Sequence, residues 1–543
     1  MSTLPRWAYQ ANPEHVRDYE LGEIFTYGKT QHPQKLAISD GKRSYTFAQL
    51  DDMATNLALW LAEQGIRCGL RVPVLAEKHA IMPVIAAACW KLGAVYVPLD
   101  SQLPAARLRK LLARLEARVA LAISPSPLED EGRWLSGDAL LAVCQQSCEA
   151  AVLPVHHHSA EQTAYIIFTS GSTGEPKGVE ISVGSLKDYF LAHNAWLRFT
   201  ESSRVFSLSP FHFDVSIEDT LLPLSLGAYV YQFASIHAGA IMRSVIAREK
   251  ITHLIAVSTL LSLITEGGKQ ILPENFASLE MVMTGAEVCD PKIINLWKNN
   301  LPGVRLINAY GPTETTIVCL CYDIDKPDTQ RTTAYPIGVP LQGVSCLILD
   351  DAQQPQTADD VPGELCIGGS LVMKGYLGQP EETAKVIFEH QGIRYYRTGD
   401  ICSRQPDGNI MYLGRRDDEV KIAGRRIHLG EIRQKCLASQ GVERAAVRKV
   451  SLNGKDHIAV VIAGKDISQL ADVESFLSEE LPQYMLPTLW GWTEAVNLSS
   501  TGKTDERTLL DQLQAAASEQ PSRYFIRQNG GTFIPMHLLT PMI

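Results

Sequence analysis

The alternation of short apolar runs with amphipathic segments constrains this chain more than any other feature of its sequence. Between Ile24 and about Arg416, helical periodicity over residues 47–64 and 83–92 is interspersed with short runs typical of strands. The strand-like runs are 71–75, 95–99, 205–208, 253–257, 279–283 and 304–308. This order predicts an α/β fold in which helices and sheets form several layers.

The length of 543 residues predicts more than one structural unit, because a single hydrophobic core stops growing well below that size. We expect a large multilayer α/β domain over residues 1–416 and a small, mobile α+β domain over 417–520. In the second domain, strands are expected over 445–450 and 458–463, and a helix over 473–481. Residues 521–543 have no helical or strand period and are expected to form a C-terminal tail.

Composition excludes several classes of protein. The net charge of −10, from 50 basic and 60 acidic residues, gives no electrostatic reason to expect nucleic acid or a membrane surface. The N-terminus is polar and no apolar stretch is long enough to span a bilayer, which predicts a cytoplasmic protein without a secretory signal. The 11 cysteines form no CxxC pair, and most are expected to be reduced, buried thiols.

Three consecutive histidines, His156, His157 and His158, could bind a metal ion. They are flanked by proline and serine, and no second group of ligands is near them in the sequence. This context favours a solvated loop.

The segment from Tyr165 to Gly178, YIIFTSGSTGEPKG, joins a β-branched and aromatic run to a loop of glycines and hydroxyl residues that ends in a lysine. Glycines let the backbone approach closely, hydroxyls donate hydrogen bonds and the lysine supplies charge, so the loop can bind anionic oxygens. The spacing is not that of the Walker loop. By itself the segment could also be an ordinary polar connection. Its candidate phosphate-binding residues are Thr169, Ser170, Gly171, Ser172, Thr173, Gly174 and Lys177.

Seven further motifs follow a recognisable order together with this loop. They are KLGAVYVPLD at 91–100, NAYGPTETT at 308–316, GELCIGG at 363–369, YYRTGD at 395–400, GRRDDEVKIAGRRIHLGE at 414–431, LPQYMLP at 481–487 and LSSTGKTD at 498–505. Over roughly residues 25–510 the chain resembles the adenylate-forming enzymes, in particular the amino acid adenylation enzymes of nonribosomal-peptide-synthetase type.

This resemblance implies an ATP site. Tyr310 offers a flat face to adenine and Asn308 offers paired donor and acceptor groups to the edge of the base. Asp400, expected at a turn, would accept the ribose hydroxyls, although an exposed aspartate beside a glycine is the commoner outcome. Arg415 would reach the ribose or a phosphate. The family pattern adds Gly285, Ala286, Ala309, Gly311 and Tyr412.

The catalytic groups implied by the resemblance are Glu314, Thr313 and Lys503. Glu314 is the candidate ligand of Mg²⁺, since a hard carboxylate oxygen suits that ion, and Thr313 would lie on the phosphate side. Lys503 would bridge the substrate carboxylate and the developing acyl-phosphate oxygen, where negative charge concentrates. A surface lysine in a turn is the structural alternative.

Domain rotation is the second implication of the resemblance. Asp417 would be the hinge, and rotation would replace Lys503 by a loop for the thioester-forming step. That loop would contain Lys421, Gly424, Arg425 and Arg426. His428 departs from the family pattern, which more often has glutamate there, and the departure is expected to affect the loop or a partner surface.

Asp214 decides which acid is activated, because amino-acid-activating members place an aspartate there to pair with the substrate α-ammonium. A helix N-cap is the structural alternative. By alignment with the family, the pocket is lined by Val215, Glu218, Ile255, Met283, Gly285, Ala309, Ile317 and Val318. Glu218 could meet the side-chain ammonium of ornithine, lysine or diaminobutyrate. Alternatively, Glu218, Ile255 and Met283 fill the pocket and leave room for glycine or alanine, which the otherwise apolar lining favours.

The expected activity is therefore ATP-dependent formation of an aminoacyl-adenylate and transfer to the phosphopantetheine thiol of a separate carrier protein. No carrier or condensation segment is seen, so the chain is similar to the D-alanine ligases of teichoic-acid modification and the glycine-activating enzyme of lipid A modification. Cell-envelope modification is the expected pathway. An acyl- or aryl-CoA ligase is the alternative enzyme, against which Asp214 argues. A non-catalytic ATP-binding scaffold would be expected to lack Lys503, Glu314 or Asp400.

Overall fold

The structure is a computed structural model that describes residues 3–8, 16–128, 131, 134–146, 153–170, 176–234, 239–287, 291–331, 333–416, 419–464, 467, 469–493, 506–527 and 532–539. The chain forms two compact units. Unit 1 consists of Met1–Ser101, Leu112–Phe168 and Gly178–Arg416, and unit 2 of Gln102–Leu111, Thr169–Lys177 and Asp417–Ile543.

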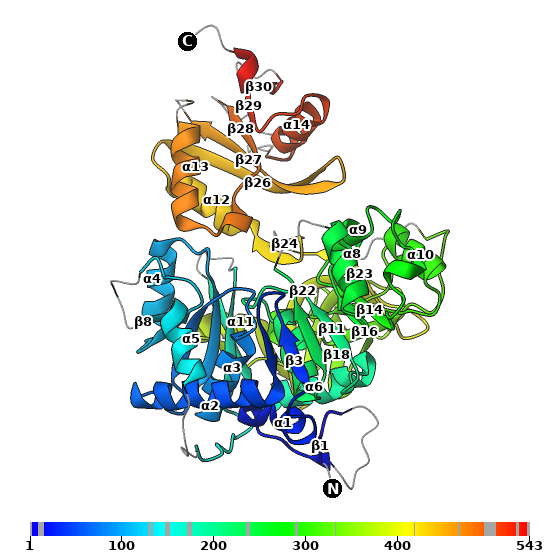
Figure 1. Cartoon of the computed structure of the whole chain (residues 1–543). Helices are drawn as coiled ribbons and strands as arrows, with labels where there is room; N and C mark the ends of the chain where they lie inside the picture. The colour runs from blue at the N-terminus through cyan, green and yellow to red at the C-terminus, as the bar shows by residue number, and fades with distance from the viewer. Residues whose placement is uncertain are drawn as a thin grey trace. The chain divides into compact units, whose positions relative to one another are not determined.

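A seven-stranded sheet forms the first layer of the N-terminal region, and its inner strands β5, β6 and β9 run parallel. In spatial order its strands are β20 (Gly375–Tyr376), β10 (Lys177–Ser182), β9 (Thr163–Thr169), β6 (Val95–Asp100), β5 (Arg71–Ala76), β7 (Ala120–Ala122) and β8 (Trp134–Ser136). Two crossover helices of this sheet, α3 (Met82–Lys91) between β5 and β6 and α5 (Gly137–Gln145) between β8 and β9, pack against α2 (Phe47–Glu63), as Figure 1 shows.

A nine-stranded sheet is the second layer, with a parallel centre and antiparallel edges. In spatial order its strands are β17 (Val339–Pro340), β16 (Leu320–Asp323), β15 (Arg305–Tyr310), β14 (Met281–Gly285), β13 (His253–Ile255), β11 (Arg204–Ser207), β12 (Tyr229–Gln232), β3 (Leu36–Ser39) and β4 (Ser44–Thr46). Residues from both sheets, among them Val74, Tyr96, Ile255 and Met283, belong to one buried hydrophobic cluster. The main core of unit 1 therefore links these two sheets.

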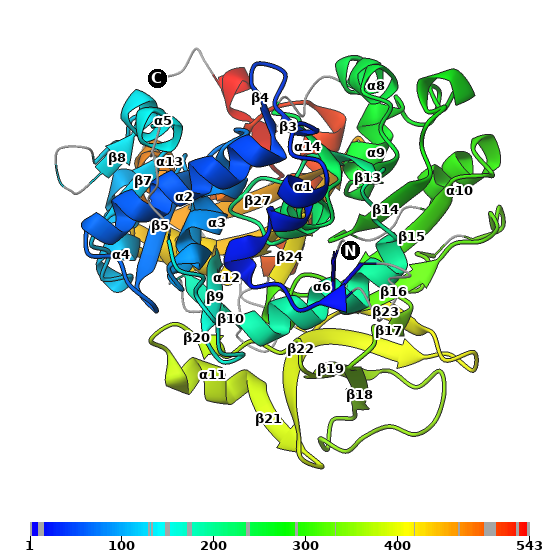
Figure 2. The ribbon, with the colours of Figure 1, turned by 60° about the horizontal axis from the view of Figure 1, so that its bottom comes forward.

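Unit 1 also contains a two-stranded parallel sheet of β1 (Leu4–Pro5) and β2 (Val16–Arg17) and a larger antiparallel sheet, which is drawn in yellow-green in Figure 2. The strands of the antiparallel sheet are β18 (Val344–Leu349), β19 (Gly363–Gly369), β21 (Ile387–His390), β22 (Ile393–Arg404) and β23 (Ile410–Arg415). Asp400 lies inside the long strand β22, so the predicted turn was wrong. The sequence signal for a turn was Gly399, whose φ is indeed +72°, but the strand continues through it.

Helices cover the sheets and begin with recognisable signals. The Thr46 side chain accepts a hydrogen bond from the Gln49 amide, and the Gln49 side chain accepts one from the Thr46 amide, which forms a capping box at the start of α2. The other helical elements before residue 417 are η2 (Leu21–Glu23), α1 (Thr26–Gln31), α4 (Ala105–Arg114), α6 (Val183–Leu197), a π-helical turn η4 (Ile217–Leu221), α7 (Leu222–Ser225), α8 (Gly239–Arg248), α9 (Ser258–Ile264), η5 (Pro273–Asn275), α10 (Pro291–Asn300), the 3₁₀ turn η6 (Thr313–Thr315) and α11 (Pro380–Val386).

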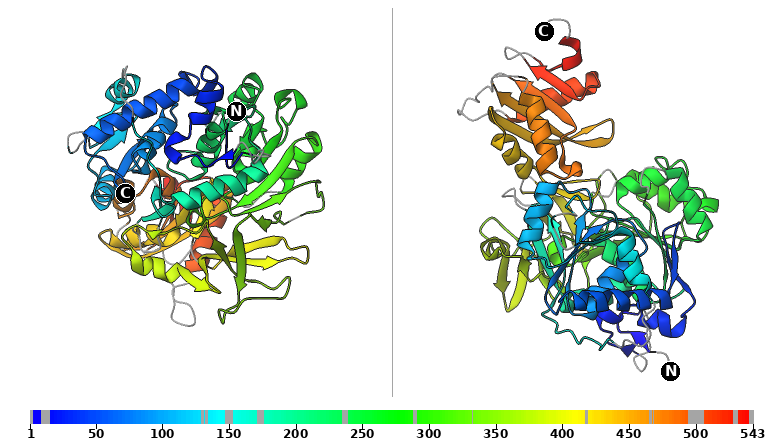
Figure 3. Two further views of the ribbon diagram at one scale, coloured as in Figure 1. Left: turned by 90° about the horizontal axis from the view of Figure 1, so that it is seen from below. Right: turned by 60° about the vertical axis from the view of Figure 1, so that its left-hand side comes forward.

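Unit 2 contains a hairpin and a five-stranded sheet, drawn in orange to red in Figure 3. The hairpin is β24 (Glu419–Ile422) and β25 (Arg425–His428); the sheet order is β26 (Val442–Leu452), β27 (Lys455–Gly464), β28 (Leu489–Thr493), β29 (Tyr524–Arg527) and β30 (Ile534–Pro535). Its helices are α12 (Leu429–Ala438), α13 (Gln469–Glu480) and α14 (Glu506–Glu519).

Two further expectations differ from the structure. Residues 521–543, in which no strand period is visible, contribute β29 and β30 to this sheet. The pairing of β29 with β28 forms this part of the sheet and buries Phe525, although the sequence of the segment does not alternate. The solvated histidine loop is wrong for His158, whose side chain is 2% exposed and whose Nδ1 lies 3.0 Å from a carboxylate oxygen of Glu20. None of the helices in the described part of the chain has both the length and the apolarity needed to cross a bilayer.

Candidate active site

Tyr310, Asp400 and Arg415, all expected at the nucleotide, lie together in unit 1. The Tyr310 hydroxyl donates a hydrogen bond to Oδ2 of Asp400, and Arg415 donates to Oδ1 at 3.0 Å. Asp400 and Arg415 are directly opposite each other on β22 and β23, which places the cation beside the carboxylate. Tyr412 packs into the same cluster as Tyr310. The antiparallel pairing of β22 with β23 thus assembles residues that are distant in sequence.

Backbone crowding explains the glycines near this group. A Cβ on Gly311 would lie 2.2 Å from the carbonyl oxygen of Ile317, and a Cβ on Gly285 would lie 2.5 Å from that of Ala309. Both distances are far below van der Waals contact, so only glycine fits. Ala286 follows Gly285 with a φ of +60°. These positions bring the ends of β14 and β15 close together.

Asn308 is almost fully buried and its amide nitrogen is already used. Nδ2 donates to the carbonyl oxygens of Pro336, at 2.7 Å, and Tyr335, at 3.4 Å. Asn308 therefore fixes the 335–336 segment beside β15.

Glu314 and Thr313 form the 3₁₀ turn η6 directly after the tyrosine motif. Glu314 is fully buried and accepts a hydrogen bond of 2.8 Å from the hydroxyl of Tyr376. A hard carboxylate oxygen is the kind of ligand that Mg²⁺ prefers, so the chemistry of this residue fits the expected magnesium ion. Among the residues that the structure describes, no group of three or more His, Cys, Asp or Glu residues could hold a metal by itself.

Asp214 lies against this turn. Burial, with a smaller contribution from the Glu314 charge, raises the pKa of its carboxyl to about 6, although a hydrogen bond with the Thr313 side chain acts in the opposite direction. The whole residue is 7% exposed. The structure thus brings the residue expected to bind the substrate ammonium beside the two residues expected to act on the phosphate and the metal.

The apolar residues expected to line the amino acid pocket share one hydrophobic cluster. Five of them are buried members, and the sixth, Val215, packs against it from a half-buried position; the five are Ile255, Met283, Ala309, Ile317 and Val318. Ile255 and Met283 are opposite each other on β13 and β14. Ile317 has a φ of +73°, which is strained for a β-branched residue. Such strain is found where surrounding structure fixes a functional segment.

Glu218 is the remaining pocket candidate, and it is fully buried in η4. It accepts a hydrogen bond of 2.8 Å from the hydroxyl of Tyr189 on α6. Burial raises the pKa of Glu218 well above its usual range. Sequence reasoning did not identify Tyr189, or Tyr376 beside Glu314, because nothing in a single sequence pairs residues from separate elements.

The predicted phosphate loop and hairpin are partly described. Thr169 ends β9 and Lys177 begins β10, while Gly171, Ser172, Thr173 and Gly174 lie outside the described residues. Within unit 2, the Ser170 hydroxyl donates to the carbonyl of Arg426 and accepts from the amide of His428, each at 3.1 Å.

The predicted thioester-step loop is a tight hairpin. Lys421 pairs with Arg426 and Ile422 with Arg425, so Ala423 and Gly424 form the two-residue turn, both with positive φ as such turns require. The Arg425 guanidinium lies 4.6 Å from the ring centroid of Tyr484. Lys503 and Asp417 lie outside the described residues.

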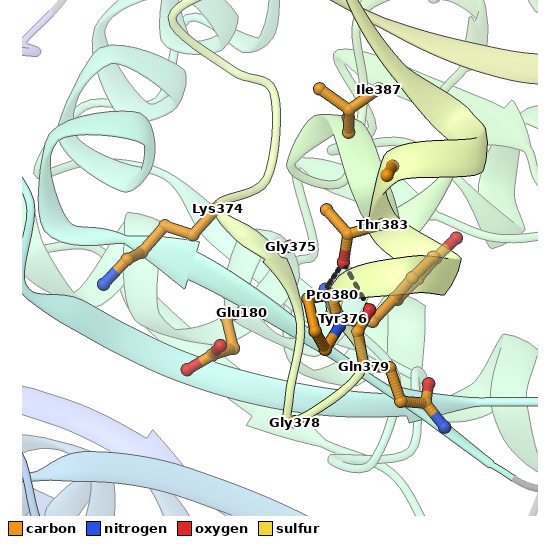
Figure 4. A pocket seen from close by; sticks show the side chains of 10 residues that line it. Glu180, Lys374, Gly375, Tyr376, Gly378, Gln379, Pro380, Thr383 and Ile387 are labelled. Atoms are coloured by element: carbon orange, nitrogen blue, oxygen red, sulfur yellow. Dashed lines mark hydrogen bonds between the residues drawn. The ribbon is translucent and has the colours of Figure 1, made fainter.

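A shallow pocket of about 430 Å³ lies beside Tyr376 in unit 1 (Figure 4). Thr383 holds its wall by accepting a hydrogen bond from the Tyr376 amide, at 2.9 Å, and donating one to the Gln379 carbonyl, at 2.9 Å. None of the residues expected at the active site lines it; the lining is Glu180, Lys374, Gly375, Tyr376, Gly378, Gln379, Pro380, Thr383, Ala384 and Ile387.

Comparison with known proteins establishes the family. The model of the AMP-binding enzyme family matches residues 25–377, and the chain belongs to this family. It is 32% identical over 525 residues to a probable non-canonical nonribosomal peptide synthetase, CymA, of Salinispora arenicola (strain CNS-205). The match covers 96% of this chain but 6% of that relative, so the chain spans a small part of the longer protein.

Solved structures confirm the predicted fold class. A nonribosomal peptide synthetase protein with adenylation and PCP domains, holo-PA1221 bound to a vinylsulfonamide inhibitor, matches with a TM-score of 0.80 and 24% identity, over 91% of this chain and 84% of that one. The Vibrio cholerae adenylation domain AlmE, in complex with glycyl-adenosine-5′-phosphate, matches with a TM-score of 0.77 and 21% identity, over 93% and 100%. The mixed α/β architecture is that of adenylation domains.

Proposed function

We propose that this protein activates an amino acid with ATP and transfers the aminoacyl group to the phosphopantetheine thiol of a carrier protein. One observation carries the proposal: the carboxyl of Asp214 is buried beside Thr313 and Glu314 and next to an apolar cluster. A buried carboxyl in such a place is unfavourable until a cation meets it, and the α-ammonium of an amino acid is such a cation. Fatty and aryl acids carry no such group.

In the first half-reaction, the substrate carboxylate attacks the α-phosphorus of ATP and pyrophosphate leaves. Asp214 would hold the substrate ammonium so that the substrate carboxylate points at the α-phosphorus. Binding would thereby orient the two reacting groups. Tyr310, Asp400 and Arg415 would hold the nucleoside, and Thr169, Ser170, Thr173 and Lys177 the departing phosphates. Magnesium, held by Glu314, would supply charge neutralisation on the phosphate oxygens.

Lys503 would act at the position where negative charge concentrates, between the substrate carboxylate and the α-phosphate. In the second half-reaction, a thiol attacks the acyl carbon and AMP leaves. Rotation about Asp417 would exchange Lys503 for the hairpin that carries Lys421, Gly424, Arg425 and Arg426.

Other observations support the proposed partner, location and substrate. A carrier protein is supported by the similarity to a protein that contains PCP domains. A reducing, cytoplasmic location is supported by the nine described cysteines, which are all free thiols, most of them buried. Activation of glycine or alanine for cell-envelope modification is one candidate role, supported by the apolar lining. Activation of a basic amino acid is the other, supported by the buried carboxyl of Glu218.

The experiment is ATP–pyrophosphate exchange with a panel of glycine, both alanine enantiomers, the other proteinogenic amino acids, ornithine and diaminobutyrate. Fatty and aryl acids form the second arm of the panel. We expect exchange with at least one amino acid and none with the acids that lack an amine. Exchange with only fatty or aryl acids would overturn the proposal and indicate an acyl- or aryl-CoA ligase.

A further inference from the structure

Four fully buried side chains form a hydrogen-bonded row behind the pocket in unit 1. Tyr189 and His193 are one turn apart on α6, Glu218 is on η4 and Cys321 is on β16. The Tyr189 hydroxyl contacts both Oε2 of Glu218, at 2.8 Å, and Nδ1 of His193. Nε2 of His193 lies 3.7 Å from the sulfur of Cys321. The row therefore joins α6, η4 and β16.

Proton counting fixes the direction of these bonds. With Glu218 ionised, as it would be opposite a bound cation, the single hydroxyl proton of Tyr189 is donated to Glu218, so the contact with His193 requires a proton on Nδ1 of the imidazole. Burial lowers the pKa of His193 to about 3, so the ring is neutral and Nε2 is an acceptor for the Cys321 thiol. Every donor in the row thus points toward Glu218.

The second carboxyl oxygen of Glu218 is different. Oε1 is buried and has no hydrogen-bond partner among the described residues, while Oε2 is held by Tyr189. A buried oxygen that lacks a hydrogen-bond partner is unfavourable. The charged and titratable groups that influence or contact this carboxyl are Asp214, Asp219, Tyr189 and His193. Burial and, to a smaller extent, the charge of Glu218 in turn raise the pKa of the Cys321 thiol. None of these described groups is a cation at neutral pH.

The row also adjoins the pocket lining. Cys321 is opposite Ala309 on β16 and β15, and both belong to the hydrophobic cluster that contains Ile255 and Met283. Asp214 and Glu218 are four residues apart at the start of a helical segment, a spacing that places side chains on one face. Two buried carboxyls thus face one apolar site.

We infer that Tyr189, oriented by His193, is a positioning residue that holds Glu218 as the acceptor for a side-chain ammonium, so the substrate is an amino acid with an amine-terminated side chain. The inference rests on the proposed amino acid adenylation. It assigns the α-ammonium to Asp214 and the second ammonium to Glu218, so that each buried carboxyl gains one cation. Glycine or alanine would leave Oε1 of Glu218 unsatisfied.

The test measures kcat and KM in ATP–pyrophosphate exchange with diaminobutyrate, ornithine and lysine, and with glycine and alanine, for four proteins. These are the wild type, Glu218→Gln, Tyr189→Phe and Tyr96→Phe. Tyr96 is the matched control, because its hydroxyl is also buried but has no hydrogen-bond partner among the described residues. Circular dichroism and thermal melting show whether each variant folds.

We expect kcat/KM to be at least tenfold higher with one of the diamino acids than with glycine or alanine. Glu218→Gln should lower that value by about a hundredfold, at least tenfold more than it lowers the glycine value, since a bond to a charged group is lost. Tyr189→Phe should lower it by about tenfold, mainly through KM, and Tyr96→Phe should not change it.

The pH profile separates positioning from a general structural role. The hydroxyl of Tyr189 lowers the pKa of Glu218, so its removal makes the carboxyl harder to ionise. The acid limb of kcat/KM for the diamino acid should therefore move to higher pH in Tyr189→Phe, while the limb for glycine stays in place.

The inference is overturned if the wild type uses glycine or alanine and no diamino acid, an outcome that leaves amino acid adenylation intact. It is also overturned if Tyr189→Phe folds and behaves like Tyr96→Phe. If Tyr189→Phe does not fold, Glu218→Gln decides: equal loss with all substrates contradicts the inference. Exchange with no amino acid at all contradicts the proposed function itself.

Discussion

The carboxylates on the expected nucleotide side and on the expected amino acid side of the candidate site differ in their partners and in their pKa shifts. On the nucleotide side, Asp400 has both oxygens bonded, to a tyrosine hydroxyl and to an arginine. On the amino acid side, Asp214 and Glu218 are buried with raised pKa values. Asp400 already has a cationic partner in Arg415, whereas Asp214 and Glu218 gain most from a cationic ligand. Under the proposed function, electrostatic selectivity would therefore reside in the amino acid half.

Replacement of Lys503 should have the largest effect, because this lysine would serve both halves at the moment of reaction. Lys503→Ala should lower kcat for adenylate formation by about a thousandfold, with little change in either KM, since the charge acts in the transition state. Pyrophosphate exchange measures the effect. Full exchange activity in the variant would remove Lys503 from the mechanism.

Asp214→Asn should affect the amino acid half alone. We expect kcat/KM for the amino acid to fall by about a hundredfold, because the bound ammonium then lacks a counter-charge, while KM for ATP changes less than threefold. Asparagine keeps the side-chain size and a hydrogen-bond acceptor for Thr313. An equal rise in both KM values would show that Asp214 supports the fold and does not select substrate.

Asp400→Asn should affect the nucleotide half alone and more weakly. KM for ATP should rise by about tenfold, because one charge-assisted contact with Arg415 is lost, and KM for the amino acid should stay within about twofold. Steady-state exchange at varied ATP gives the number. A larger effect on the amino acid would contradict the assignment of Asp400 to the nucleotide.

The last prediction concerns stability, which depends on pH through Asp214. The pKa of Asp214 is raised in the folded protein, to about 6. The contribution of this carboxyl to the free energy of unfolding is therefore fully present below about pH 4 and is lost as pH rises through about 6, where the buried group must ionise. Asp214→Asn removes this penalty. Relative to wild type, the ligand-free variant should gain about 2 kcal/mol of stability between pH 4 and pH 8, measured by thermal or urea unfolding. An unchanged difference across that range would mean that Asp214 is not buried as described.

Much of the fold could be predicted from the sequence because the strands carry local signals. The runs 71–75 and 95–99 became β5 and β6 almost residue for residue, since a buried parallel strand must be apolar along its length. Asp400 could not be placed, because its local Thr-Gly-Asp pattern is typical of turns, while the pairing of β22 with β19 and β23 is a long-range property.

The site was only partly predictable for the same reason. Family motifs identify Tyr310, Asp400 and Arg415, and the structure brings these three together. The partners of the buried carboxyls, Tyr189 for Glu218 and Tyr376 for Glu314, are 29 and 62 residues away in sequence. A single sequence contains no local pattern that links such pairs.

The measurement that tests amino acid activation most directly compares the best amino acid substrate with its des-amino analogue, which has the same carbon skeleton and carboxylate. Pyrophosphate exchange is measured for both, with the wild type and with Asp214→Asn. We expect the wild type to prefer the amino acid by at least a hundredfold and the variant to lose most of that preference. Equal exchange with the two acids by the wild type would contradict the recognition of an α-ammonium by Asp214.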